Sequence, residues 1–220
     1  MKTSLITLLI LVVSVGYAQN KKYVKTMETT IESLNNAGGL DEFDPIINKF
    51  ARIGQAEATQ WEPFYYAAQG HVFKSFRIDN LAQKDEVLNQ ALTALSSASE
   101  LSKNNAEILA LEGFINMLKI SVDPGTRGQQ LSPKIMASYS QALAIEPDNP
   151  RANLFMAQMQ IGTAMFFGTG TEEPCKMVKK SLELFNAEKS SEPLAPKWGS
   201  DMAMQYAKTC KIETGGTSGN

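Results

Sequence analysis

Hydrophobic residues recur at spacings of three and four along most of this chain, a pattern that indicates amphipathic helices. Short polar stretches rich in Gly, Pro, Asn or Asp separate one such segment from the next. The predicted helices are residues 22–35, 41–54, 61–76, 84–102, 106–120, 132–145, 150–167, 175–187 and 198–210. Neighbouring helices with short connections pack antiparallel, so the pattern predicts an all-α protein.

The N-terminus differs from the rest of the chain. Lys2 precedes an apolar core from Leu5 to Val15, and small residues, Gly16 and Ala18, follow that core. This order is typical of a secretory signal peptide, with cleavage after Ala18. The apolar run is shorter than the roughly 20 residues that a membrane-spanning helix needs, and we expect no span in the mature chain. We therefore expect a periplasmic or secreted protein, with one helical domain over residues 19–212 and a disordered tail over 213–220.

The segment from Tyr139 to Ala157 joins two of the predicted helices. Its helical pattern stops at Pro147 and restarts at Pro150. Tyr139, Ala142, Pro147 and Ala157 stand at the offsets of a tetratricopeptide repeat (TPR), in which small residues allow two antiparallel helices to approach closely.

One spacing departs from a plain repeat. The matching small positions Gly113 and Ala157 lie 44 residues apart, whereas a TPR unit has about 34 residues. The segment Ser121–Pro133 contains two prolines and two glycines, and we assign the extra residues to an irregular loop there.

These motifs resemble the TPR family most clearly over Ala106–Phe167. The stretches WEPFYYAA, EPDNPRA, FFGTG and KWG also resemble a group of small secreted repeat proteins of Bacteroidota with no established activity. The resemblance implies a TPR-like α-solenoid of about four antiparallel helix pairs plus a C-terminal capping helix. It supplies no catalytic residue.

Charge and cysteine content narrow the functional classes. Of 21 basic residues one is Lys2, in the signal peptide, and 23 residues are acidic, so the mature chain is mildly negative and nucleic-acid binding is disfavoured. Cys175 and Cys210 fall at opposite ends of a predicted helical hairpin, which favours a disulfide in an oxidising compartment. The alternative, a redox-active pair, lacks the Cys-x-x-Cys spacing.

No catalytic or metal motif is present in the sequence. His71 is the single histidine, and neither a Gly-x-Ser-x-Gly turn nor a metalloprotease motif occurs. We expect His71 to be a partly buried helix residue, and we predict a non-enzymatic protein without a metal or cofactor.

The candidate binding residues lie on two predicted surfaces. In a stacked array the first helix of each pair lines a concave groove, and the candidates there are Tyr65, Gln69, Glu107, Phe114, Arg151 and Gln158. Packing in the core is the alternative for Tyr65 and Phe114. The second surface is a rim of irregular loops, where Arg127 either satisfies Asp123 and nearby helix carbonyls or binds an anionic ligand.

The sequence therefore predicts a secreted or periplasmic scaffold that binds a protein or peptide of the cell envelope. An alternative is a small-ligand protein for a glycan or anionic metabolite, based on the aromatic cluster Trp61, Tyr65 and Tyr66. A third alternative is a hydrolase acting through His71 or through carboxylates of the loops. The partner and the oligomeric state stay open.

Overall fold

The computed structural model describes residues 21–188 and 192–212, and the predicted signal peptide and tail lie outside these ranges. The described residues are helices joined by short connections, with no strand among them. A first helical stretch covers residues 21–36. It is followed by α2 (Leu40–Ala56), α3 (Glu62–Ser75), α4 (Leu81–Leu101), α5 (Ala106–Val122), α6 (Pro124–Ile145), α7 (Pro150–Phe167), α8 (Glu172–Ala187) and α9 (Ser200–Thr209).

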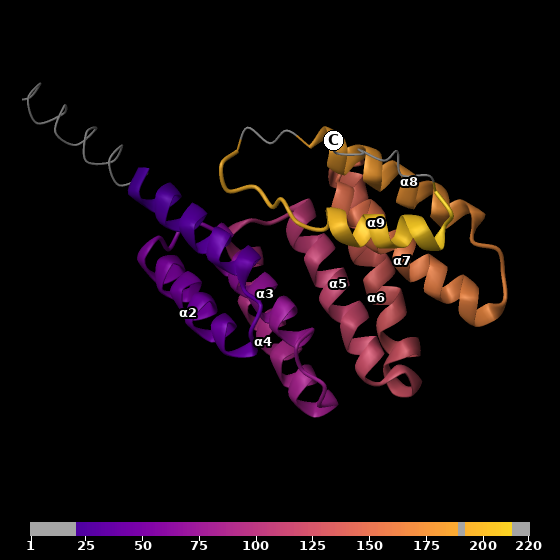
Figure 1. Cartoon of the computed structure of the whole chain (residues 1–220), viewed down its shortest axis with the longest axis horizontal. Coiled ribbons are helices and arrows are strands. Elements are labelled where there is room, and N and C mark those ends of the chain that lie inside the picture. The colour runs from indigo at the N-terminus through magenta and orange to yellow at the C-terminus, as the bar shows by residue number, and fades with distance from the viewer. Residues whose placement is uncertain (1–20, 189–191, 213–220) are drawn as a thin grey trace, which may run out of the picture.

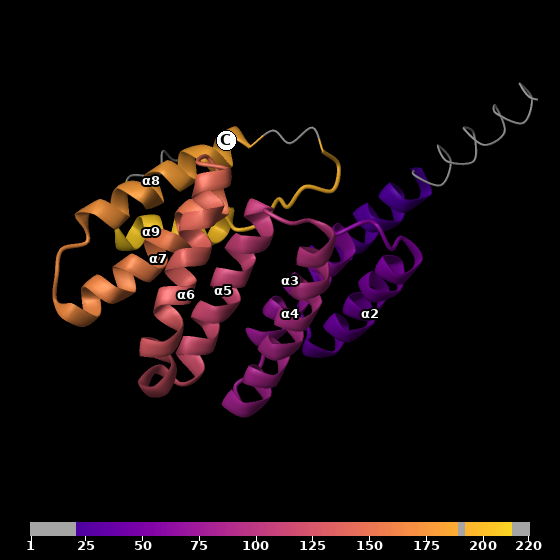
Figure 2. The ribbon, with the colours of Figure 1, turned by 180° about the vertical axis from the view of Figure 1, so that it is seen from behind.

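The helices stack side by side in chain order from one end of the molecule to the other (Figures 1 and 2). Residues 21–36 pair with α2, α3 with α4, α5 with α6 and α7 with α8, while α9 packs on α8 as a cap. The predicted fold, a TPR-like α-solenoid of antiparallel pairs with a C-terminal capping helix, is confirmed. The domain bounds 19–212 stay a prediction.

Glycines in α2, α3 and α5, namely Gly54, Gly70 and Gly113, permit close packing of the helices. A Cβ atom on Gly54 would lie 2.7 Å from the Phe64 ring, and one on Gly113 would collide with the Tyr139 ring. Tyr139 itself is completely buried, as are Ala142 and Ala157. The TPR positions therefore act as the sequence indicates, by bringing helix backbones together.

The predicted irregular loop at Ser121–Pro133 is wrong. After α5 ends at Val122, the Asp123 side chain accepts a hydrogen bond from the Thr126 amide and caps α6, which begins at Pro124. Proline in the first turn costs no helical hydrogen bond, and α6 continues through Pro133. The extra residues thus lengthen two helices, so the predicted rim of irregular loops does not include this segment.

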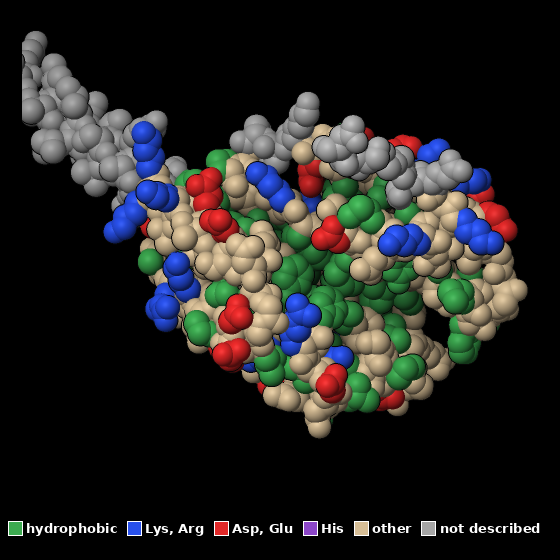
Figure 3. All heavy atoms as spheres, in the orientation of Figure 1, with side chains coloured by type: hydrophobic (Ala, Val, Ile, Leu, Met, Phe, Trp, Pro, Cys, Tyr) green, Lys and Arg blue, Asp and Glu red, His purple; other side chains and the backbone are tan. Residues whose placement is uncertain are grey.

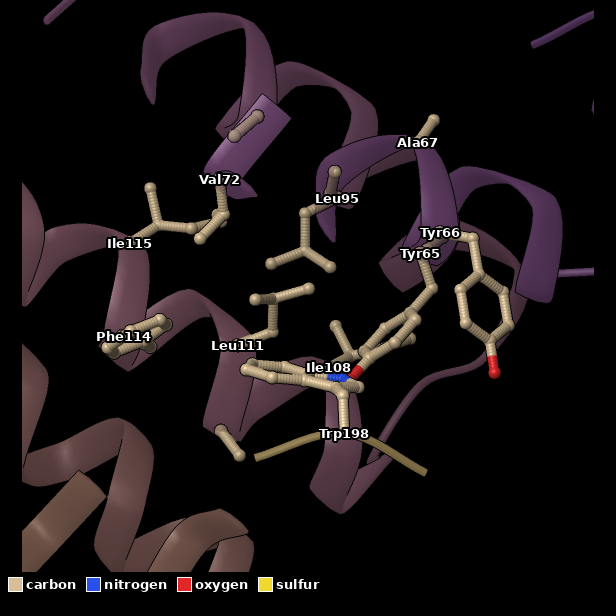
Figure 4. Packing of buried hydrophobic residues seen from close by; sticks show 14 of the residues in the cluster. Tyr65, Tyr66, Ala67, Val72, Leu95, Ile108, Leu111, Phe114, Ile115 and Trp198 are labelled. Carbon is tan, nitrogen blue, oxygen red and sulfur yellow. The ribbon is translucent and has the colours of Figure 1, made fainter. Parts of the chain in front are cut away.

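The C-terminal part of the chain is tied to the array at two points. Figure 4 shows Trp198, which precedes α9, reaching in among side chains of α3 and α5. Cys175 in α8 and Cys210, directly after α9, form the predicted disulfide, with their Cα atoms 5.5 Å apart. This disulfide holds the capping helix α9 against the last helix pair, α7 and α8.

Candidate functional site

The centre of the concave side is occupied by the chain itself. The indole of Trp198 packs against Phe155, with ring centroids 5.6 Å apart, and against Phe73 at 5.8 Å. Leu194 is also buried, and its carbonyl accepts a hydrogen bond of 3.0 Å from the Tyr66 hydroxyl. The segment before α9 therefore lies where a TPR-like array has its groove.

Arg151 fixes this segment through buried charge. Its Nε donates to Glu107 Oε2 at 2.6 Å, its Nη2 pairs with Glu188, and its Nη1 donates to the Trp198 carbonyl at 2.9 Å. Burial alone would lower the pKa of Arg151, but the two carboxylates more than reverse this and raise it. Tyr65 completes the network, because its hydroxyl donates to Glu107 and accepts from Trp198 Nε1.

The candidate residues of the concave groove thus face the protein interior, except Gln158, which lines an apolar recess between α5, α6 and α7. Tyr65, Glu107 and Arg151 come together in the network just described, and Phe114 stacks on Phe155 beside it. Four of the six, Tyr65, Gln69, Phe114 and Arg151, are almost completely buried. Tyr66 is buried as well, so two rings of the aromatic cluster proposed for glycans are core residues. A ligand-binding role for these side chains stays a prediction.

An acidic hollow of about 950 Å³ adjoins the closed centre, between residues 21–36, α5, α7 and the segment before α9. Several of its carboxylates have partners within the chain. Glu62 accepts from the Tyr23 hydroxyl, Asp148 pairs with Lys180, and Glu107 and Glu188 pair with Arg151.

A second concavity is apolar and open. It has a volume of about 840 Å³ and lies between the end of α5, the first turns of α6 and the second half of α7. In Figure 3 it is the recess between α6 and the end of α7. We call it the α5–α6–α7 groove. It is lined by Met117, Ile120, Ser121, Pro124, Gly125, Gly128, Gln129, Ser132, Pro133, Gln158, Met159, Gly162, Thr163, Phe166 and Phe167. None of these residues is charged.

Large apolar side chains project at the mouth of the α5–α6–α7 groove. Met165, Phe166 and Phe167 are 69%, 82% and 70% exposed, and the two phenyl rings stand at 89° to each other. Gly168, with φ of 67°, ends α7 directly after them. Three adjacent exposed hydrophobic residues beside an apolar recess are typical of a binding site.

An ion triad holds the α6 wall of this groove in place. Asp85 of α4 binds Lys119 of α5 at 2.8 Å and Arg127 of α6 through both carboxylate oxygens. The hydrogen bond from Arg127 is the main reason that the pKa of Asp85 falls to about 2. Arg127 also donates to the Lys119 carbonyl, so its guanidinium serves the helix contacts that the sequence offered as one of its two roles.

His71 lies on α3 and is partly buried. Its Nδ1 has no hydrogen-bond partner among the described residues, and burial lowers the pKa of the imidazole to about 4. Within the described ranges no three His, Cys, Asp or Glu side chains are placed to hold a metal ion. No helix in the same ranges has the length and hydrophobicity to cross a membrane.

Reasoning from the sequence missed the α5–α6–α7 groove because it treated one wall as loop. Helical numbering of residues 124–133 would have placed Gly125, Gly128 and Ser132 along one face, opposite the second half of α7. The adjacent pair Phe166 and Phe167, directly before a glycine, was the other available signal.

No family model and no curated protein matches this sequence. Among solved structures the chain is similar to the HusA haemophore from Porphyromonas gingivalis, with 27% identity and a TM-score of 0.76 over 90% of this chain and 97% of that one. It is also similar to a thermophilic TPR protein from Thermus thermophilus, with 15% identity and a TM-score of 0.50 over 91% and 96% of the two chains. This protein therefore has a TPR-like fold that resembles a bacterial haemophore over nearly its whole length.

Proposed function

We propose that this chain is a non-enzymatic, secreted binding protein that holds haem or a related tetrapyrrole in the α5–α6–α7 groove. The observation that carries the proposal is the groove itself, an open recess lined without a single charged residue. Support comes from the similarity to the HusA haemophore. The closed concave centre argues for the same groove, because Trp198 and Arg151 occupy the alternative surface.

The chemistry of the groove suits a flat, apolar ring system with polar groups on its edge. Its volume of about 840 Å³ falls in the range of roughly 300–1,000 Å³ for small-molecule sites. Ser121, Gln129 and Thr163 offer hydrogen bonds to edge groups, while Phe166 and Phe167 offer aromatic contact. Met117 and Met159 are the lining residues with a sulfur donor for iron.

Secretion is part of the proposal. The N-terminal pattern predicts a signal peptide, and the disulfide between Cys175 and Cys210 is of a kind that persists in oxidising compartments.

Titration of the mature protein with haemin, followed by absorbance and by quenching of tryptophan fluorescence, tests the proposal. We expect saturable binding that the double variant Phe166→Ser/Phe167→Ser weakens by about tenfold or more, since aromatic anchors dominate binding energies. Leu40→Ser, which removes an exposed apolar side chain of α2, at the other end of the helical array from the groove, is the matched control. Absence of saturable binding, or equal affinities for the double variant and the control, contradicts the proposal.

Binding of an envelope protein or peptide is the second candidate, and the acidic hollow favours it. Carboxylates concentrated in one hollow attract a basic segment, and this attraction weakens with salt. Glu146 and Asp148 both line this hollow. Crosslinking in the native envelope, compared between wild type and Glu146→Gln/Asp148→Asn, tests whether a partner binds there. Loss of a specific crosslinked partner in the variant supports this candidate, and an unchanged set of crosslinks contradicts it.

A further inference from the structure

The glycines inside the helices of this protein are of two kinds. At Gly54, Gly70 and Gly113 a Cβ atom would meet a neighbouring side chain at less than 3 Å, so the packing of the fold requires glycine there. At Gly128 in α6 and Gly162 in α7, as at Gly125 in the first turn of α6, a Cβ atom would meet no described atom within 4 Å. The described packing gives no reason for glycine at these positions, and Gly128 and Gly162 are the two that lie beyond the first turn of their helix.

Backbone conformation gives no reason either. The glycines with positive φ among the described residues are Gly168 and Gly199, so Gly128 and Gly162 have angles that any residue adopts. Glycine within a helix is nevertheless less favourable than alanine, because it loses more conformational freedom on folding. Both positions therefore carry a cost to stability that no contact with the described residues offsets.

What the two glycines share is their place. Gly128 lies on the α6 wall of the α5–α6–α7 groove and Gly162 on the α7 wall, and both belong to its lining. Because glycine has no side chain, the groove is wider at these two positions than it would be with any other residue there.

We infer that Gly128 and Gly162 determine the ligand specificity of the groove, by leaving its two walls free of side chains so that a broad, flat ring system fits between α6 and α7. This inference rests on the proposed function, since a tetrapyrrole is the flat ligand concerned. It adds that the ring faces lie against the glycine backbone, and that a side chain at either position excludes a four-ring ligand before it excludes a smaller aromatic one.

The test compares haemin with the smaller probe anilinonaphthalene sulfonate on Gly128→Leu, Gly162→Leu and Gly162→Ala. Ser140→Leu, which adds the same side chain to an exposed position of α6 outside the groove, is the matched control. We expect each leucine variant to weaken haemin binding by about tenfold or more, the size of effect that overpacking produces. The naphthalene probe should bind the leucine variants within about twofold of wild type, and Gly162→Ala should fall between wild type and Gly162→Leu for haemin.

Thermal unfolding of each variant accompanies the titrations, and we expect midpoints at or above that of wild type because leucine and alanine favour helix more than glycine does. If wild type binds haemin and the leucine variants bind it equally well, the inference about glycine fails while the proposed function stands. If wild type does not bind haemin, the proposed function fails and the inference fails with it. A leucine variant with a lowered midpoint is replaced by the alanine variant, whose unchanged haemin affinity would also refute the inference.

Discussion

The concave centre and the α5–α6–α7 groove are two concavities of one helical array with opposite properties. The centre is filled by Trp198, and its polar groups are paired through the buried Arg151. The groove is open, uncharged and bordered by exposed Phe166 and Phe167. The concave groove lined by the first helix of each pair is thus not the only surface of a helical solenoid that can offer a binding site.

The difference has a local cause in the chain. Residues 192–199 follow α8 and return across the first helices of the pairs, and the disulfide fixes the helix that comes next. The end of α5 and the first turns of α6 instead border an open recess with the second half of α7. Stability should therefore depend strongly on the closed centre and weakly on the groove, as the following predictions test.

The largest effect should come from Arg151→Met. The variant leaves Glu107 and Glu188 without their buried cation, and we expect a loss of about 3–5 kcal/mol in the free energy of unfolding. Urea denaturation monitored by circular dichroism measures it. Lys176→Met, which removes an exposed pair with Glu173, is the control and should cost no more than about 1 kcal/mol. Equal losses in the two variants would show that the centre is not held by Arg151.

Removal of the disulfide should have the next largest effect. Cys175→Ser/Cys210→Ser opens a loop with a sequence separation of 35, and the entropic model gives a loss of about 3–4 kcal/mol. Chemical denaturation with and without reductant checks this. Wild type in reductant should approach the stability of the double variant, and the variant should not respond to reductant. An unchanged wild-type midpoint in reductant would contradict the prediction.

The third effect is a loss of stability on acidification through His71. Burial lowers its pKa from 6.5 to about 4 in the folded protein, so the folded state favours the neutral ring. The contribution of His71 to the free energy of unfolding is therefore fully present above pH 6.5. As the pH falls toward 4, the protein should lose about 2–3 kcal/mol of this free energy. Unfolding free energies of wild type and His71→Gln, each measured at pH 7 and pH 4, isolate the contribution of His71. All other groups titrate in both proteins, so the difference between the two losses belongs to His71. Parallel losses in the two proteins would assign the acid sensitivity to other residues.

The sequence was sufficient for the helices and their pairing. Periodic apolar residues and the small residues at Gly113, Ala142 and Ala157 predicted the stacked array, because each of these signals is local. The pairing of Cys175 with Cys210 followed from the symmetry of a hairpin. Helix propensity gave the wrong prediction at residues 121–133, because proline and glycine there indicated a loop. In the structure Asp123 caps α6 and Pro124 occupies its first turn, so residues that usually break a helix begin one.

The two concavities could not be predicted because they depend on long-range contacts. Arg151 was a reasonable groove candidate until Glu188 and Trp198, from a segment 37 to 47 residues later, enclosed it. Phe166 and Phe167 resemble core residues by type, and only the divergence of α7 from α6 leaves them exposed. The spacing of residues along one helix therefore predicts neither the burial of Arg151 nor the exposure of Phe166 and Phe167.

The smallest effect should be a gain in stability at the groove. Gly128→Ala and Gly162→Ala add a methyl group to open space, and each should raise the unfolding free energy by about 0.5–1 kcal/mol through helix propensity. Gly113→Ala is the matched control, because its methyl group would collide with Tyr139 and should destabilise the protein. Opposite signs at Gly113 and Gly162, measured by urea denaturation, would show that glycine serves packing in the array but not in the groove. A loss of stability at Gly162 as well would mean that the α7 wall packs more closely than the open recess allows.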